Sequence, residues 1–340
     1  MRRLLRPRRA VRRAGLAIVS SLVAAATAGA QGTVPSCTSS SALVDPAQLC
    51  QKARDLFSFV TPQIGVAVSG GNPIPGDAGS LGGFGRRALS VRVVGVEGFL
   101  PRNDVPLDVG TTAVDFGAAR TLVPLPAADV AIGLFAGVPF GLTNIGGVDL
   151  LLGATLLPSV SRNAFELDPS NGGLGFAYGL RVGALQESSV VPGLSVSWQR
   201  RELPKTDFYY RSGNDSLQVE GALVRSNAFR VIVSKRLALV GLAAGVGQDQ
   251  VESTSNMSGT VNETVNSTAV RYTVSLSGLR EYSKRNTAFV NASISILAAR
   301  IVGEYGWSGA GTIASTVNSF GGRRANEGYR YGSIGISARF

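Results

Sequence analysis

Much of this chain alternates between apolar and small or polar residues with a period of two. Between 174 and 183, leucine, phenylalanine, tyrosine, leucine and valine alternate with glycine, alanine and arginine. The last ten residues, 331–340, repeat the pattern, with Ile334, Ile336 and Phe340 on one face of an extended strand. Because successive side chains of a strand point to opposite faces, each run predicts a strand with one apolar and one polar face.

The same alternation recurs at 89–94, 194–199 and 290–296. Segments of about ten residues with this pattern are typical of a transmembrane β-barrel. The 43 glycines, with 44% hydrophobic and only 16% charged residues, agree with a β-rich wall, because glycine is unfavourable in helices. The alternative is a secreted soluble β-sandwich or adhesin.

The most apolar region, 130–157, requires a separate test for a transmembrane helix. Pro139, Asn144, Gly146 and Asp149 divide it into two pieces of strand length. A membrane-spanning helix needs about 20 uninterrupted apolar residues. We therefore expect a hairpin here.

The first thirty residues have the pattern of a secretory signal peptide. Residues 1–13 contain seven arginines and no acid, 15–28 are apolar, and a small-residue cleavage site ends at Ala30. A retained anchor, a mitochondrial transit peptide and a twin-arginine signal are the alternatives. Cleavage leaves 26 basic and 22 acidic residues, a net charge of +4, without a basic cluster for nucleic acid.

Two cysteines, Cys37 and Cys50, follow the signal and are separated by twelve residues. In an oxidising periplasm we expect them to form a disulfide that adds about 2–4 kcal/mol, the alternative being two unlinked thiols. We expect 31–60 to be an N-terminal segment with a short helix through Gln48, Lys52 and Phe57, in the periplasm or in the barrel mouth. The barrel itself is expected to occupy 61–340.

Short periplasmic turns and long outer loops set the parity of the strand count. We expect twelve strands, with fourteen as the alternative, because 269–278 alternates as well and is placed in an outer loop at 251–284. The predicted strands lie near 62–71, 86–98, 109–119, 127–138, 146–157, 173–186, 193–202, 216–234, 238–250, 285–297, 299–307 and 327–340.

Three segments carry a family resemblance: 229–247, the run Ile301-Val302-Gly303-Glu304-Tyr305, and the closing Gly335-Ile336-Ser337-Ala338-Arg339-Phe340. They resemble an uncharacterised family of bacterial outer-membrane β-barrel proteins, distantly like the long-chain fatty-acid transporters. The resemblance covers roughly 190–340. It implies a barrel in the bacterial outer membrane, with Phe340 in the signal read by the barrel-assembly machinery, and no functional residues to carry over.

Charged residues on the non-lipid face are the candidate lumen residues, since a charge facing lipid costs about 2–4 kcal/mol at mid-membrane. They either line a permeation path or fill a narrow lumen with ion pairs. By strand parity these residues are Arg92, Arg181, Glu220, Arg230, Arg300, Glu304 and Arg339.

The absence of histidine argues against enzymatic activity of the usual outer-membrane kinds, which use histidine as a base. The carboxylates of Asp249 and Glu252 are interpreted as solvated loop residues. No catalytic, metal or cofactor site is expected. We expect porin-like, passive or facilitated transport of small solutes, hydrophobic ones included; the alternative is a structural or assembly protein. Expected partners are the lipid bilayer, lipopolysaccharide and an unidentified solute.

Overall fold

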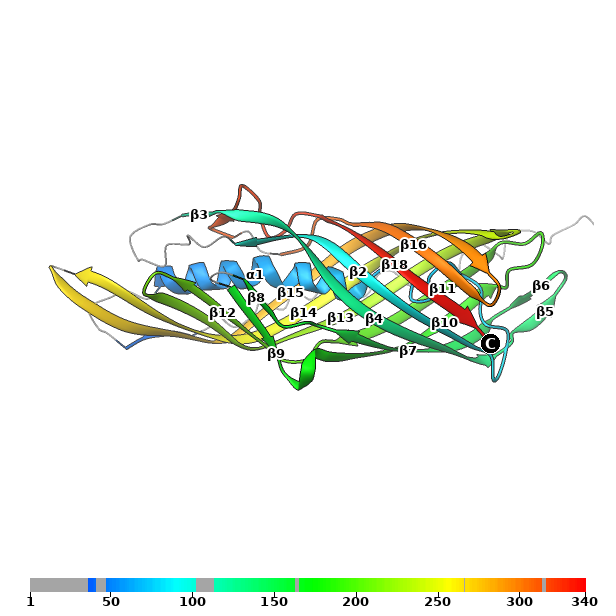
Figure 1. Ribbon diagram of the computed structural model, residues 1–340, viewed down its shortest axis with the longest axis horizontal. Coiled ribbons are helices and arrows are strands. Elements are labelled where there is room, and N and C mark those ends of the chain that lie inside the picture. Colours follow the sequence, from blue (N-terminus) through cyan, green and yellow to red (C-terminus); the bar gives the residue numbers. More distant parts are fainter. Residues whose placement is uncertain (1–35, 41–46, 102–112, 163–164, 266, 314–315) are drawn as a thin grey trace, which may run out of the picture. The chain divides into compact units, whose positions relative to one another are not determined.

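A closed ring of antiparallel strands frames the molecule (Figure 1). The computed structural model describes residues 36–40, 47–101, 113–162, 165–265, 267–313 and 316–340. Within these residues ten strands each pair with two ring neighbours, and β18 pairs with β2 to close the ring. In ring order they are β2 (Arg87–Pro101), β4 (Ala118–Phe135), β7 (Gly147–Leu156), β10 (Leu174–Leu185), β11 (Gly193–Glu202), β13 (Asp215–Leu237), β14 (Val240–Val265), β15 (Thr268–Ile296), β16 (Ala299–Ser308) and β18 (Tyr329–Arg339).

The two ends of the ring differ in their connections. At one end, here called the turn end, two residues join β13 to β14 and two join β15 to β16. Arg87 and Phe340 exchange backbone hydrogen bonds at the same end, N to O 2.9 and 3.1 Å. Longer connections, including 309–328, lie at the opposite end, here called the loop end.

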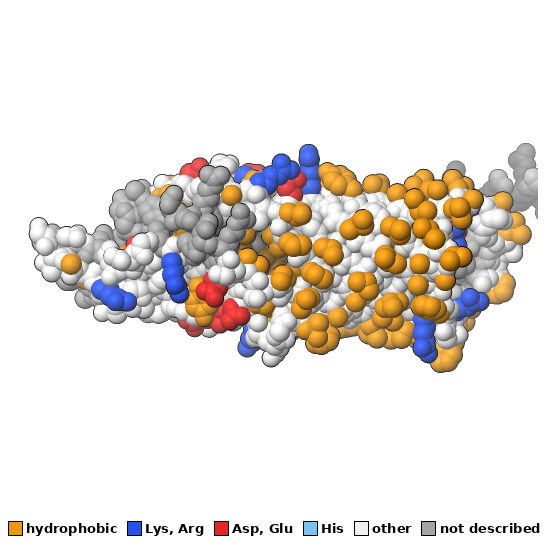
Figure 2. Space-filling view, in the orientation of Figure 1, with side chains coloured by type: hydrophobic (Ala, Val, Ile, Leu, Met, Phe, Trp, Pro, Cys, Tyr) orange, Lys and Arg blue, Asp and Glu red, His pale blue; other side chains and the backbone are white. Residues whose placement is uncertain are grey.

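The outer surface of the ring is apolar near the turn end. Val91, Phe176, Val231, Val290 and Ile334 are among its exposed side chains. Figure 2 shows such side chains gathered in a band over the ring strands, with charged side chains outside it. This is the surface that a bilayer would cover.

Three ring strands are much longer than a bilayer requires. β13, β14 and β15 contain 23, 26 and 29 residues, whereas about 9–11 residues span a membrane. The loop-end parts of these strands, together with the flanking strands, form what we call the extension. Its flanking strands are β12 (Thr206–Ser212), β9 (Phe165–Pro169), β8 (Val160–Arg162) and, on the other side, β1 (Ser36–Ser39). Smaller elements are β3 (Asp115–Phe116), β17 (Ser319–Phe320), β5 (Val138–Phe140), β6 (Thr143–Ile145) and η1 (Asn171–Gly173).

The polarity of β15 reverses along its length. In the extension its inward residues are apolar, as at Tyr272 and Leu276, while nearer the turn end they are polar, as at Asn291 and Ser293. A bulge at Gly278, φ 71°, shifts the register against β14 and so changes which residues face inward. The extension therefore has the apolar interior of a soluble sheet, and the ring has the polar interior of a membrane barrel.

The predicted all-β antiparallel barrel is confirmed. The main sheet contains 14 strands among the described residues, the number given as the alternative, and ten of them close the ring. The segment 251–284, expected as an outer loop, instead continues β14 and β15. Two separate strands were predicted at 109–119 and 127–138. A single strand, β4, covers 118–135 instead. No described helix is long and apolar enough to cross a membrane.

The N-terminal helix is longer than predicted. Helix α1 (Ala47–Ser69) has 23 residues and includes 62–69, where a first strand was expected, so that the barrel begins at Arg87 and not at 61. The strand prediction at 62–71 was wrong because the helix lies inside the ring of strands (Figure 1) and is buried on all sides there, which removes the 3.6-residue pattern. Pro62 lies within it, and the Thr61 hydroxyl and Gln63 amide donate to the carbonyls of Phe57 and Phe59, both at 2.9 Å.

Candidate functional site

Buried ion pairs line the inner wall of the ring. Arg181 contacts Asp149 at 2.8 Å and Arg230 contacts Asp249 at 2.6 Å, with all four side chains at most 1% exposed. A buried charge is costly unless it is paired, and opposing strands supply the partner in each case. Each pair joins two neighbouring strands of the wall, β7 with β10 and β13 with β14.

Asp129 on β4 joins two arginines. Its carboxylate lies 3.2 Å from the Arg92 guanidinium and 2.7 Å from that of Arg201. Arg201 also donates to Gln199 Oε1 at 3.1 Å. One carboxylate therefore balances part of two positive charges from β2 and β11, which are not neighbours in the ring.

The sequence analysis missed several of these partners. Strand parity could have identified Asp129, Asp149 and Arg201, because each is a charged residue at an inward position of a strand whose outward face is apolar. Asp249 was interpreted as a solvated loop residue, which was wrong because β14 continues through it and turns its side chain inward. Glu252 is partly exposed, 3.7 Å from Arg280.

A segment of the chain passes through this polar lumen. After α1 ends at Ser69, residues 70–86, here called the crossing segment, lead from the middle of the ring to the turn end, where β2 begins. Arg230 donates to the Gly70 carbonyl at 2.9 Å, Arg92 to the Asn72 carbonyl at 3.0 Å, and Arg300 to the Gly76 carbonyl at 2.9 Å. The wall thus supplies donors to a segment that has no secondary-structure partner of its own.

Acceptors on the wall complete the arrangement. The Asn72 N–H donates to Glu304 Oε2 at 2.8 Å, and the Leu81 N–H to Asp149 at 3.0 Å. Glycine allows the backbone to approach the wall here, since a Cβ at Gly71 would overlap the Glu304 carboxylate in its present position. The crossing segment is therefore bonded to the wall along its length and fills the lumen.

The structure places six of the seven predicted lumen residues toward the interior. Arg92, Arg181, Arg230, Arg300 and Glu304 are buried, and Arg339 is half-buried at the turn end, paired with Asp77.

Glu220 differs from the prediction. It is exposed and accepts a hydrogen bond from the Ser258 hydroxyl at 3.0 Å. A bulge on β13 at Gly221, φ 58°, shifts the register, so that a parity counted from Arg230 places Glu220 on the wrong face.

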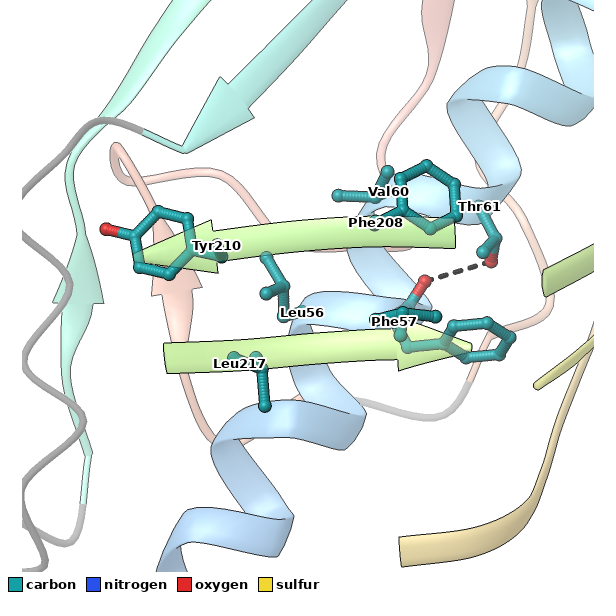
Figure 3. A pocket seen from close by; sticks show the side chains of 8 residues that line it. Leu56, Phe57, Val60, Thr61, Phe208, Tyr210 and Leu217 are labelled. Atoms are coloured by element: carbon teal, nitrogen blue, oxygen red, sulfur yellow. Dashed lines mark hydrogen bonds between the residues drawn. The ribbon is translucent and has the colours of Figure 1, made fainter. Parts of the chain in front are cut away.

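An apolar pocket lies between α1 and the extension (Figure 3). Its cavity volume is about 30 Å³, enough for one or two small molecules of the size of water. An organic solute would need the walls to move apart. The lining residues are Leu56, Phe57, Val60, Thr61, Phe208, Tyr210, Leu217 and Val219.

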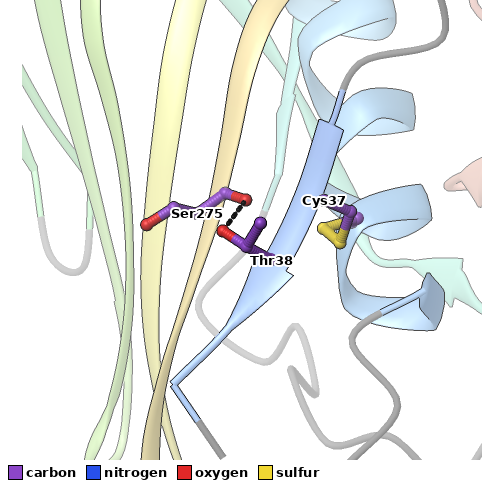
Figure 4. The surroundings of a disulfide bond; sticks show 4 residues. Cys37, Thr38 and Ser275 are labelled. Carbon is purple, nitrogen blue, oxygen red and sulfur yellow. Dashed lines mark hydrogen bonds between the residues drawn. A yellow bond between two sulfur atoms is a disulfide. The ribbon is translucent and has the colours of Figure 1, made fainter.

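A disulfide fixes the start of this arrangement (Figure 4). Cys37 on β1 is bonded to Cys50 on α1, as predicted, with Cα atoms 6.2 Å apart. β1 pairs with β15 from Cys37 opposite Leu276 to Ser39 opposite Val274. The disulfide therefore ties the first turn of α1, through β1, to β15 in the extension. Residues 1–30, the predicted signal peptide, lie outside the described residues, and their cleavage near Ala30 stays a prediction.

The side chains collected here do not form a set for metal binding. The described residues contain no group of three or more cysteine, aspartate, glutamate or histidine residues that could hold a metal ion. What the arrangement does is close the lumen, by ion pairs and by hydrogen bonds to the backbone of the crossing segment.

The chain is an antiparallel β-barrel with an apolar outer band and a polar inner wall. No protein-family model matches it, and no curated protein does. Among solved structures it is similar to the translocator domain of the autotransporter NalP from Neisseria meningitidis, with 11% identity over 76% of this chain and 89% of that one and a TM-score of 0.32. It is also similar to the Pseudomonas putida toluene transporter TodX, with 10% identity, 75% and 88% coverage and a TM-score of 0.26, and to a Pseudomonas aeruginosa FadL homologue, with 8% identity, 75% and 90% coverage and a TM-score of 0.24. The expected similarity to bacterial outer-membrane barrels is thus found, without a family assignment.

Replacing Asp129 with alanine should destabilise the barrel by about 3–5 kcal/mol, because two buried guanidinium groups lose their shared partner. Urea unfolding of the detergent-bound protein measures this. Asp168→Ala, at an exposed position on β9, is the matched control and should change the free energy of unfolding by less than about 0.5 kcal/mol. Equal effects of the two substitutions would contradict a structural role for the Asp129 cluster.

Asp55 on α1, in the extension, should make stability depend on pH. Burial raises the pKa of its carboxyl, although Asn318 and Gln51 donate hydrogen bonds to it. The folded state therefore disfavours the ionised form, and the free energy of unfolding should rise as pH falls from 7 through the raised pKa. Asp55→Asn should increase stability at pH 7 and reduce this slope. The free energy of unfolding of this variant should still depend on pH to some extent, because burial also raises the pKa of Glu281.

The control for this pH measurement is Asp115 on β3, whose pKa is lowered by hydrogen bonds from the Gly322 N–H and the Ser319 hydroxyl. Stability from this carboxylate is present at neutral pH and lost on acidification. Asp115→Asn should therefore lower stability at pH 7, the opposite direction. An Asp55→Asn variant with an unchanged pH profile would refute the proposed burial cost.

Proposed function

We propose that this protein is a closed outer-membrane barrel that acts as an anchor for a structure at the cell surface. The single observation that carries this proposal is that α1 and the crossing segment fill the interior of the ring. The ion pairs and the filled interior support a structural or interaction role over a permanent pore. The extension would be the part that meets other molecules.

The orientation follows from the connections. Periplasmic connections of outer-membrane barrels are short and outer loops are long, so the turn end faces the periplasm and the extension faces outward. β1 and the first turn of α1 then lie at the outer surface, and the chain passes inward through the lumen to β2. The proposal therefore favours the barrel mouth over the periplasm for the N-terminal segment.

A surface structure of this kind needs rigidity outside the membrane. The apolar interior of the extension packs on α1, where Phe59 is fully buried and stacks on Phe320 with ring centroids 4.1 Å apart. The disulfide then fixes the outer end of the helix. Lipopolysaccharide and the bilayer would surround the apolar outer band of the ring.

Transport of small hydrophobic solutes is the second candidate. The pocket between α1 and the extension favours it, because its lining is almost wholly apolar. Hydrogen bonds hold much of the crossing segment to the wall, and water can replace these bonds if the segment moves. Ile74 and Leu81 add apolar contacts with Ala131 and Leu151 that such a movement would also break. Transport would then require displacement of this segment.

Conductance in a planar bilayer separates the two candidates. The full-length protein should produce no conductance steps, and liposomes containing it should take up hydrophobic solutes no faster than empty liposomes. A variant that lacks residues 36–84 should show conductance steps, since the lumen loses its contents. Heat-modifiable gel mobility identifies the folded fraction of each preparation.

Open channels in the full-length protein, or solute uptake above that of empty liposomes, would contradict the anchor role. Uptake without conductance would establish transport by a moving segment. Both results are readable without knowledge of the natural solute.

A further inference from the structure

The turn end contains a second, larger cavity that the anchor role does not use. Its volume is about 290 Å³, and polar groups line it. We call it the turn-end pocket. It is formed by Asp77, Gln186, Glu187, Ser188, Ser189, Arg236, Ala238 and Arg339.

Positive charge exceeds negative charge around this pocket. The two carboxylates are both engaged: Asp77 pairs with Arg339, and Glu187 accepts hydrogen bonds from the Arg236 N–H at 2.5 Å and the Ser234 hydroxyl at 2.9 Å. Four cationic groups belong to the pocket or border it, which leaves a local net charge of about +2. These groups are Arg236, Arg339, Lys235 and Arg300.

The Arg236 guanidinium is the group available to a ligand. It is exposed at the mouth, and among the described residues the contacts of Arg236 involve its backbone N–H and not its guanidinium. The neighbouring Lys235 ammonium is used differently, since it donates to the carbonyls of Ser188 and Ser189, both at 2.8 Å, and so holds the 186–189 loop over the pocket. Arg300 is held by the Gly76 carbonyl at 2.9 Å. The wall of the pocket is thus fixed while one guanidinium remains free.

A planar guanidinium in a preformed cationic cavity is suited to an oxyanion, which it binds through two parallel hydrogen bonds. The charge excess matches a phosphate group, which carries one to two negative charges. The turn residues Leu237 and Leu239 next to Arg236 are exposed apolar side chains of the membrane band, so lipid headgroups also reach this mouth.

We propose that the turn-end pocket binds a phosphate group through Arg236, supplied either by the headgroup of an anionic phospholipid in the inner leaflet or by a free phosphate in the periplasm. The phosphate would lie beneath the 186–189 loop, against the positive charges of Arg236, Arg300 and Arg339. The pocket shares Asp77, Arg300 and Arg339 with the lumen contacts, and the two sources of phosphate rest on the proposed orientation, but the Arg236 guanidinium takes no part in closing the lumen.

Two probes distinguish the sources of the phosphate. Inorganic phosphate is titrated calorimetrically into the full-length protein in a zwitterionic detergent. Separately, native mass spectrometry measures how much phosphatidylglycerol, relative to phosphatidylcholine, the protein retains from nanodiscs that contain both. Binding of phosphate in detergent indicates a soluble source, and preferential retention of phosphatidylglycerol alone indicates a lipid source.

The decisive variant is Arg236→Gln, which keeps the backbone N–H bonded to Glu187. It should weaken whichever probe binds by about ten-fold, the expected loss of a charge-assisted hydrogen-bonded pair. The control is Arg330→Gln, at an exposed position near the loop end of β18, which should behave as the unmodified protein. Heat-modifiable mobility verifies that each variant folds.

The proposal is overturned if neither probe binds the unmodified protein. It is also overturned if both substitutions reduce binding equally, since the effect would then reflect net charge alone. Arg236→Lys, which keeps the charge but loses the planar fork, should lie between the two variants.

Discussion

The constraint on which the rest of the structure depends is the need to pair charges on the inner wall of a closed ring. A barrel whose outer face is covered by lipid must place its polar side chains inward, and these become buried once the lumen is narrow. Asp149 and Asp249 each pair with an arginine on a neighbouring strand, and Asp129 pairs with two arginines. The carbonyls of the crossing segment accept hydrogen bonds from arginines of the wall. The lumen is therefore closed by the same contacts that make its wall stable.

The interior changes character along its axis, and the chain changes with it. In the extension the interior is apolar, and the buried helix α1 fills it. In the part of the ring nearer the turn end the interior is polar, and the crossing segment, which is not helical, fills it. The change coincides roughly with Ser69, the last helical residue, whose hydroxyl bonds to that of Ser226 on β13. Each part of the N-terminal segment thus matches the wall that surrounds it.

Strand periodicity predicted the barrel and most of the inward charges, because the alternation of a strand survives wherever its two faces meet different environments. It failed where both faces meet the same environment. Residues 62–69 are enclosed on all sides, so nothing in Ile64, Val66 and Val68 distinguishes a buried helix from a strand. Counting strand parity also failed past a bulge, as at Glu220, because one extra residue in a strand moves the following side chains to the opposite face. A glycine in the sequence does not by itself show where such a bulge occurs.

The central claim is that the N-terminal segment enters the lumen from outside, with β1 at the cell surface. An epitope tag inserted directly before Ser36 tests it, compared with the same tag in the Leu297–Ala298 turn at the opposite end. Antibody should label intact cells that carry the first tag, whereas the second should be labelled only after the outer membrane is permeabilised. Labelling of the first tag only after permeabilisation would contradict the account.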